Sequence, residues 1–235
     1  RGDRQPEHTQ IDIEMSFVSK DDVFAVVERM LAHVFKKTMD VELQIPFQRI
    51  PYDDAMNRFG TDKPDLRFGL ELQDFSHFVA GSGFKIFEEV EASGGSVKAL
   101  VAPGCAEYSR KQIEELEAAA KTYGAKGLAW MKLTDEGLTG GISKFFSADT
   151  AKISEMLGAQ TGDLILLVAD RWNTCCTSLG AVRTKLGHDL ELAGSDFAFC
   201  WIVDFPLFEW NDNDKKWDPA HHMFSMPQEK YLETL

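Results

Sequence analysis

The sequence lacks several features that would point to a simple class of function. No apolar run comes near the roughly 18 residues that a membrane span needs, which excludes a transmembrane segment. Basic residues are outnumbered: 25 Lys and Arg stand against 38 Asp and Glu, for a formal net charge of −13. This balance argues against non-specific coating of nucleic acid or anionic lipid. The 235 residues, 44% of them hydrophobic, are enough for one large domain or two small ones with a packed core.

Cysteine is scarce, and its spacing indicates neither a metal site nor a disulfide. Cys105, Cys175, Cys176 and Cys200 form no C-x-x-C pair, and the adjacent Cys175 and Cys176 are poorly spaced for either role. We expect small core hydrophobes in a cytoplasmic protein.

Short catalytic motifs are missing as well. The sequence has no P-loop, G-x-G-x-x-G, H-E-x-x-H or G-x-S-x-G motif and no zinc-type Cys/His spacing. It opens in charged sequence without signal-peptide character and closes on a helix-like pattern over 228–235. We interpret the chain as an excised piece of a longer protein.

The most regular pattern lies near the start of the chain. Residues 10–17 alternate without a fault, which predicts a strand with Ile11 and Ile13 on one face and Gln10, Asp12 and Glu14 on the other. Such a polar face is either solvated or the floor of a polar pocket, and the alternation does not decide between them.

A helix is predicted directly after this strand. Ser19 and Asp22 have capping-box spacing, and an apolar stripe continues for three turns from Val23 to Phe35. We expect this helix to pack against a core, with His33 on the surface.

Strands and helices alternate through the rest of the chain and predict one α/β module. After a short helix that Gly60 ends, the expected strands are 96–101, 127–133 and 164–169, and the expected helices are 109–123, 148–157 and 174–186, with Ser147 and Gly187 as end signals. A strong strand over 199–206 and a polar hairpin over 210–217 follow.

Two places hold residues suited to chemistry. One is the amino end, where Arg1, Arg4, Gln5 and His8 precede the polar face of the predicted strand. Arginines are suited to binding phosphate oxygens. The alternative interpretation is a charged surface loop without a binding role. The other is His221-His222, a pair more often structural than catalytic, of which at most one member faces a given site in a strand.

Four stretches resemble bacterial-type aspartyl-tRNA synthetases, in family order. Residues 4–14 (RQPEHTQIDIE) resemble the second half of motif 2, and residues 60–67 (GTDKPDLR) resemble the stretch before the inserted domain. Residues 123–129 (YGAKGLA) resemble the inserted domain, of the GAD type shared with an amidotransferase subunit. Residues 201–206 (WIVDFP) and His221-His222 resemble the return to the catalytic domain.

The resemblance implies an α+β fold: part of a class II synthetase antiparallel-sheet catalytic domain, interrupted by an α/β GAD-type insertion domain. The implied domains are 1–68 (catalytic, first part), 69–198 (insertion) and 199–235 (catalytic, return segment). The implied function is aspartate–tRNA ligase, with ATP and L-aspartate as substrates and Mg2+ held mostly by residues outside this chain. The implied acceptor is tRNA-Asp, and whether tRNA-Asn is also charged is left open.

The same resemblance implies the roles of individual residues. Gln5 matches a glutamine that contacts ATP, and His8 stands where many relatives carry an adenine-stacking Phe. Asp12 matches the acid that receives the substrate ammonium, with Gln10 and Glu14 as secondary candidates. His221 matches a histidine that binds the substrate aspartate, and His222 is the alternative if the register differs by one residue. Arg1 and Arg4 lie in the loop that approaches the tRNA acceptor end in this family.

We expect the full-length enzyme to be a cytoplasmic homodimer with neither membrane nor DNA as a partner, and we expect this piece alone to be inactive. The alternative is a non-catalytic RNA-binding or scaffolding module of GAD type. Motif 2 and the histidine pair on either side of the inserted block favour the synthetase.

Overall fold

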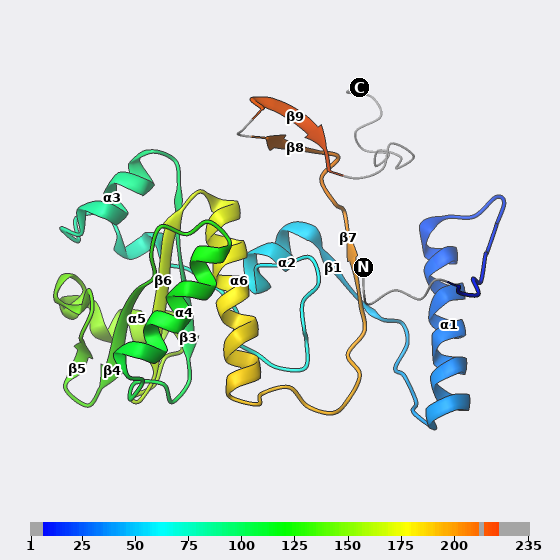
Figure 1. Cartoon of the computed structure of the whole chain (residues 1–235), viewed down its shortest axis with the longest axis horizontal. Helices are drawn as coiled ribbons and strands as arrows, with labels where there is room; N and C mark the ends of the chain where they lie inside the picture. The colour runs from blue at the N-terminus through cyan, green and yellow to red at the C-terminus, as the bar shows by residue number, and fades with distance from the viewer. Residues whose placement is uncertain (1–6, 212–213, 221–235) are drawn as a thin grey trace. The chain divides into compact units, whose positions relative to one another are not determined.

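The computed structural model describes residues 7–211 and 214–220, and the chain divides after Gln48 into two compact units (Figure 1). The first unit contains helix α1 (Lys20–Met39), which begins as predicted. The backbone N–H of Ser19 donates to the Asp22 carboxylate at 2.8 Å, which confirms the capping box. These hydrogen bonds from Ser19 also lower the pKa of Asp22.

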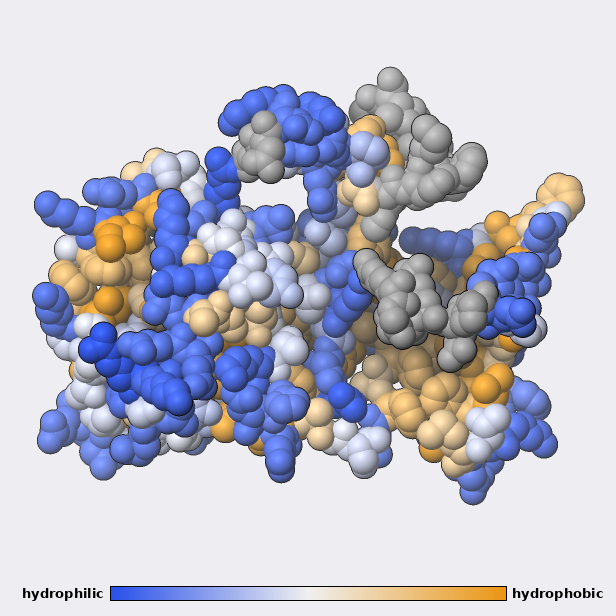
Figure 2. Space-filling model, in the orientation of Figure 1, coloured by the Kyte–Doolittle hydropathy of each residue, from blue (hydrophilic) through white to orange (hydrophobic). Residues whose placement is uncertain are grey.

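The predicted packing of α1 is wrong. Val23 and Val34 of its apolar stripe are 40% and 41% exposed, and Figure 2 shows apolar surface along this helix. Glu28 is instead the buried residue of α1, where its Oε1 accepts the backbone N–H of Phe47 at 3.1 Å. The described part of this unit has no second helix to cover the stripe.

The strand predicted over residues 10–17 is also wrong: these residues form a loop. Ile11 is 72% exposed, and Phe17 is fully exposed with a left-handed φ of 58°. A strand forms only when its N–H and C=O groups pair with a neighbour, and the described residues offer none. Alternation identified two faces but not a partner.

The second unit is built on a five-stranded sheet in the order β2-β3-β6-β4-β5, with every neighbouring pair antiparallel. Its strands are β2 (Gln73–Asp74), β3 (Ser96–Ala102), β4 (Ala129–Thr134), β5 (Gly137–Thr139) and β6 (Leu164–Asp170). Strands β3 and β4 follow one another in the chain but are separated in the sheet by β6, so together with the helix between them they form a split β-α-β unit. The α+β class is confirmed, and the alternating elements form an antiparallel sheet.

The sheet is covered on both faces, so the unit has three layers. Its helices are α3 (Lys85–Ala92), α4 (Arg110–Thr122), α5 (Thr150–Leu157) and α6 (Trp172–Asp189), with short 3-10 turns at Ser76–Phe78, Ser143–Phe145 and Ser147–Asp149. Leu164, Leu166 and Val168 of β6 pack with α4 and α6, whereas Ile165 and Leu167 pack on the other side with α3 and α5. This period-two division explains why β6 reads as a continuous apolar run.

Some element ends follow the sequence signals and others differ; helix α6, for example, begins at Trp172, two residues before the predicted start. Ser109 and Gln112 form the predicted capping box of α4. Helix α5 begins at Thr150, not at Ala148, because Ser147 opens a 3-10 turn. Helix α6 continues past Gly187 to Asp189: this glycine is helical, and an added Cβ there lies 2.4 Å from the Phe68 ring. Close packing, not chain termination, requires Gly187.

A smaller platform joins the two ends of this unit. Strands β1 (Gln48–Pro51) and β7 (Cys200–Val203) pair, and helix α2 (Tyr52–Phe59) packs on them. Gly60 ends α2 at φ 70°, as predicted. Strands β8 (Phe208–Asn211) and β9 (Lys216–Pro219) form the predicted hairpin.

The cysteines behave as expected from their spacing. All four are free thiols; Cys105, Cys175 and Cys176 are buried, and Cys200 is half-buried. Burial raises the pKa of Cys175 to about 12 and that of Cys176 to about 11, so both remain neutral thiols in the core.

Candidate functional site

Four of the site residues predicted near the start of the chain are described by the structure, and they lie in one exposed loop. His8, Gln10, Asp12 and Glu14 are all exposed and precede α1. Arg1, Arg4, Gln5, His221 and His222 lie outside the described residues. Within the described residues, this loop alone carries predicted ATP-binding and aspartate-binding residues.

The structure places a groove elsewhere, between α2, α4 and α6, with Glu209 of β8 at its edge. The Tyr52 hydroxyl donates to Glu209 at 3.4 Å, and burial together with this carboxylate raises the pKa of Tyr52 to about 12. Lys185 forms an ion pair with Asp189 at 2.8 Å. The groove thus presents a neutral hydroxyl and a paired charge.

Helix α2 is joined to α6 by direct backbone contact. A Cβ on Gly60 lies 2.1 Å from the Cys176 carbonyl, and a Cβ on Gly180 lies 2.5 Å from the Gly60 carbonyl. No larger side chain fits between these two elements as they stand.

Side chains strengthen the same joint around Asn57 of α2. The Trp172 indole N–H donates to Asn57 Oδ1 at 2.8 Å, and Lys98 Nζ donates to the Asn57 carbonyl at 3.3 Å. Helix α6, strand β3 and helix α2 are therefore connected by hydrogen bonds as well as by packing.

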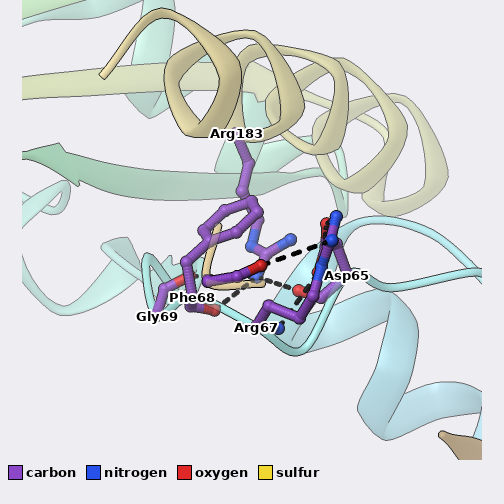
Figure 3. Close-up of polar contacts among 6 residues, drawn as sticks. Asp65, Arg67, Phe68, Gly69 and Arg183 are labelled. Carbon is purple, nitrogen blue, oxygen red and sulfur yellow. Dashed lines mark hydrogen bonds and ion pairs between the residues drawn. The ribbon is translucent and has the colours of Figure 1, made fainter. Parts of the chain in front are cut away.

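Arg183 of α6 holds the connection that leads from α2 to β2 (Figure 3). Its Nε donates to the Leu70 carbonyl at 2.8 Å, and its Nη2 donates to the carbonyls of Asp65, Phe68 and Gly69 at 2.9, 3.1 and 2.9 Å. The side chain is 1% exposed, and burial lowers its pKa. An arginine fork is suited to this role because several N–H groups lie in one plane.

Two exposed ion pairs flank Arg183. Arg67 donates from Nε and Nη2 to the Asp65 carboxylate at 2.9 and 2.7 Å, and this hydrogen bonding lowers the pKa of Asp65. Arg58 binds Glu71 in the same two-pronged way and lowers the pKa of that carboxyl group. Both pairs shape the connection from the solvent side.

Sequence reasoning did not identify Arg183 or Gly180 as important. Each carried a signal: an arginine next to the apolar positions Leu179, Val182 and Leu186, and a glycine inside a predicted helix. The signals marked unusual positions, but their partners are more than 100 residues away in the sequence.

Metal-binding clusters and membrane-spanning helices are both absent from the described residues. Between residues 7 and 220, with the gap at 212–213, no group of three or more His, Cys, Asp or Glu side chains is placed to hold a metal ion. No helix in that part of the chain is long and apolar enough to cross a membrane.

Comparisons with known proteins match both the inserted block and the whole chain. The GAD domain family model matches residues 87–179, which run from α3 into α6. A Treponema denticola protein named Aspartate--tRNA(Asp/Asn) ligase is 58% identical over 100% of this chain and 40% of its own length. Proteins of the same name from Treponema pallidum (strain Nichols) and Moorella thermoacetica are 54% and 48% identical, over 100% and 98% of this chain and 40% and 39% of their own lengths.

The fold and the family match define the class of protein: an α+β chain that contains a GAD domain. Along its whole length the chain is homologous to part of proteins named Aspartate--tRNA(Asp/Asn) ligase, which confirms the resemblance seen in the sequence. The chain spans about 40% of the length of the curated relatives it matches.

Proposed function

We propose that this chain is part of an enzyme that activates L-aspartate with ATP and transfers the aspartyl group to the 3′ end of tRNA-Asp. The observation that carries the proposal is 58% identity, over the whole chain, to a protein named Aspartate--tRNA(Asp/Asn) ligase. Because that name includes both tRNAs, charging of tRNA-Asn is part of what a test must measure.

The chemistry requires positioning more than bond-making by the protein. The aspartate α-carboxylate attacks the α-phosphorus of ATP in line, a new carboxylate–phosphorus bond forms, and pyrophosphate leaves. A site accelerates this step by holding both reactants in place and by balancing the charge that builds up on the phosphate oxygens. Mg2+ supplies part of that charge when bound; the described residues show no cluster to hold it, so none is assigned to it.

Aspartate recognition is proposed to use opposite charges at both ends of the substrate. Asp12 receives the ammonium group, with Gln10 and Glu14 as supporting residues, and the His221 imidazolium meets the side-chain carboxylate, with His222 as the alternative. The exposure of Asp12 leaves it accessible to a ligand.

ATP and tRNA are proposed to bind at the start of the chain. Gln5 contacts ATP, and His8 stacks on the adenine ring. Arg1 and Arg4 contact the tRNA acceptor end, where arginine suits both phosphates and bases.

The larger assembly is also part of the proposal. We infer domains at 1–68, 69–198 and 199–235, a homodimeric full-length enzyme and a cytoplasmic location, with no membrane or DNA partner. The GAD match at 87–179 falls inside the middle domain.

Separate losses of aspartate and ATP binding test these assignments in the full-length enzyme. Asp12→Ala should raise the KM for aspartate more than the KM for ATP in ATP–pyrophosphate exchange, and Gln5→Ala should do the reverse. Glu115→Ala, which removes an exposed carboxylate on α4, is the control and should change neither. Equal losses for both substrates in both variants refute the division of roles.

A further inference from the structure

The β8–β9 hairpin has one polar face and one aromatic face. Side chains of a strand alternate between the two faces of a sheet, and residues directly opposite each other on paired strands share a face. In this hairpin Trp210 lies opposite Trp217. The polar face carries Glu209, Asn211, Lys216 and Asp218. The other face carries Phe208, Trp210, Trp217 and Pro219.

The polar face is the one that meets the rest of the second unit. The Tyr52 hydroxyl of α2 donates to the Glu209 carboxylate at 3.4 Å. Within the hairpin, Asn211 Nδ2 donates to the Asp218 carboxylate at 2.7 Å, and Lys216 Nζ forms an ion pair with the same carboxylate at 3.4 Å. Because the polar face is directed to α2, the aromatic face is directed away from it.

The aromatic face is uncovered in the described structure. Phe208, Trp210 and Trp217 are 53%, 47% and 65% exposed. The two tryptophan rings pack edge to face across the strands, with their centroids 5.6 Å apart, and form a single aromatic surface. A cluster of exposed aromatic side chains rimmed by polar residues is typical of a contact surface.

The hairpin also has two open edges. Among the described residues, β8 and β9 pair with each other and with no further strand. A two-stranded sheet is marginally stable in water unless additional strands or a helix cover its apolar face. The hairpin therefore requires a cover that the described part of the chain does not supply.

The area of the aromatic face argues against a second copy of the chain as this cover. Three aromatic side chains at about half exposure present roughly 300 Å², so two copies bury roughly 600 Å² together, against about 1,200 Å² or more in a stable interface. Two identical hairpins would therefore bury too little surface to hold two molecules together.

The charge of the hairpin argues against nucleic acid as the cover. Its described acidic residues Glu209, Asp214 and Asp218 outnumber its basic residues Lys215 and Lys216. Lys216 is already paired with Asp214 and Asp218, at 3.3 and 3.4 Å. Nucleic acid binding relies on basic side chains that neutralise phosphates, and this hairpin has no excess of them.

We infer that the aromatic face of the β8–β9 hairpin is an intramolecular docking surface, covered in the full-length protein by an apolar segment outside these 235 residues. This chain matches only 40% of the length of the Treponema denticola protein, so more than half of a protein of that length lies outside the match. A small apolar contact suffices between parts of one polypeptide, because the effective concentration of an attached segment is high.

The test compares side-chain accessibility in the full-length protein and in this chain by hydroxyl-radical footprinting with mass spectrometry. Trp210 and Trp217 should oxidise about fivefold or more slowly in the full-length protein, because the core of a packed interface excludes water as a protein interior does. Tyr123, 57% exposed at the end of α4, is the internal reference and should oxidise at the same rate in both proteins.

A pair of variants tests the face itself by hydrogen exchange. In the full-length protein, Trp217→Ser should accelerate exchange of the amides of 208–211 and 216–219 about tenfold, because it weakens the packing that protects the hairpin. Lys216→Ser changes the neighbouring position on the polar face and should alter these rates by less than about twofold. In the 235-residue chain, Trp217→Ser should have a smaller effect than in the full-length protein, since the face has no cover there.

The outcomes decide between the possible covers. Equal oxidation of Trp210 and Trp217 in the two proteins overturns the inference. Protection that disappears on dilution of the full-length protein indicates a second copy, and protection that appears only after tRNA is added indicates nucleic acid; either result also overturns it. Footprinting of the wild type decides even if Trp217→Ser does not fold.

This test measures accessibility and not catalysis. A full-length protein without aspartate-dependent ATP–pyrophosphate exchange therefore overturns the proposed function and leaves the docking surface standing. Conversely, an active enzyme with unprotected Trp210 and Trp217 overturns the docking surface alone.

Discussion

Helices α1 and α4 carry similar apolar stripes and similar capping boxes, yet they are covered to very different degrees. In α4, Ile113 and Leu116 are 6% and 1% exposed, whereas Val23 and Val34 of α1 are 40% and 41% exposed. Both helices begin directly after the N-cap serine that the sequence indicates. Local signals therefore define a helix in each region, but only the second unit supplies the sheet and the second helix that turn a stripe into a core.

The largest test of this comparison is a matched pair of core truncations. Leu116→Ala should lower the free energy of unfolding of this chain by about 2–5 kcal/mol, because it leaves a cavity in a closed core. Leu31→Ala on α1, at a half-buried position, should cost less than about 1 kcal/mol. Urea unfolding monitored by far-UV circular dichroism measures the free energy of unfolding of both variants. Similar losses of stability in the two variants contradict the claim that α4 is covered by a core and α1 is not.

The second test addresses the joint between α2 and α6. Gly180→Ala should destabilise the second unit by about 1–3 kcal/mol, because the added methyl group meets the Gly60 backbone and neither element can give way easily. Gly69→Ala is the control, since no atom lies within 4 Å of its Cβ position. Tryptophan fluorescence in urea follows this unit alone because all five tryptophans lie in it. A Gly180→Ala variant as stable as the control contradicts the close approach.

A third test uses a buried hydroxyl without a hydrogen-bond partner. Among the described residues, the Ser178 hydroxyl is fully buried and lacks a hydrogen-bond partner. Ser178→Ala should therefore leave stability unchanged or raise it by up to about 1 kcal/mol, since an unsatisfied buried hydroxyl is itself unfavourable. Thr177→Ala is a suitable control, because that hydroxyl donates to the Asn173 carbonyl at 2.9 Å. A clear loss of stability in Ser178→Ala shows that the hydroxyl has a partner.

The smallest expected effect concerns acid stability of the 65–70 connection. Arg67 hydrogen bonds hold the pKa of Asp65 below its ordinary value of 3.8. A carboxyl group with a lower pKa in the folded state stabilises the fold above its unfolded pKa, and this contribution is lost as pH falls through the folded value. Asp65→Asn should therefore flatten the decline in stability below about pH 4, measured as urea midpoints across that range. An unchanged pH profile rules out this contribution.

Much of the fold could be predicted from the sequence because its signals are local. The capping boxes at Ser19 and Ser109, the stop at Gly60 and the buried run of β6 depend on neighbours in the chain, and all were confirmed. The helix end predicted at Gly187 was wrong, because the sequence does not distinguish a glycine that ends a helix from one that makes room for an aromatic ring, here that of Phe68. The strand over 10–17 failed because pairing depends on a second segment.

Less of the candidate site than of the fold could be predicted from the sequence. The motifs resembled those of aspartyl-tRNA synthetases, and homology to part of proteins named Aspartate--tRNA(Asp/Asn) ligase, along the whole chain, confirmed that resemblance. The hydrogen bonds of Arg183 to residues 65–70 depend on folding across more than 100 residues, which no local pattern predicts. The roles assigned to Asp12, Gln5 and the histidine pair stay predictions.

One assay tests the central claim most directly: aspartate-dependent ATP–pyrophosphate exchange by the full-length protein and by this 235-residue chain, side by side. We predict exchange with the full-length protein and none with the chain alone, because its described residues leave Asp12 in an exposed loop and do not assemble a site around it. Exchange by the chain alone contradicts the claim that the site is incomplete. A full-length protein that does not respond to aspartate contradicts the proposed function.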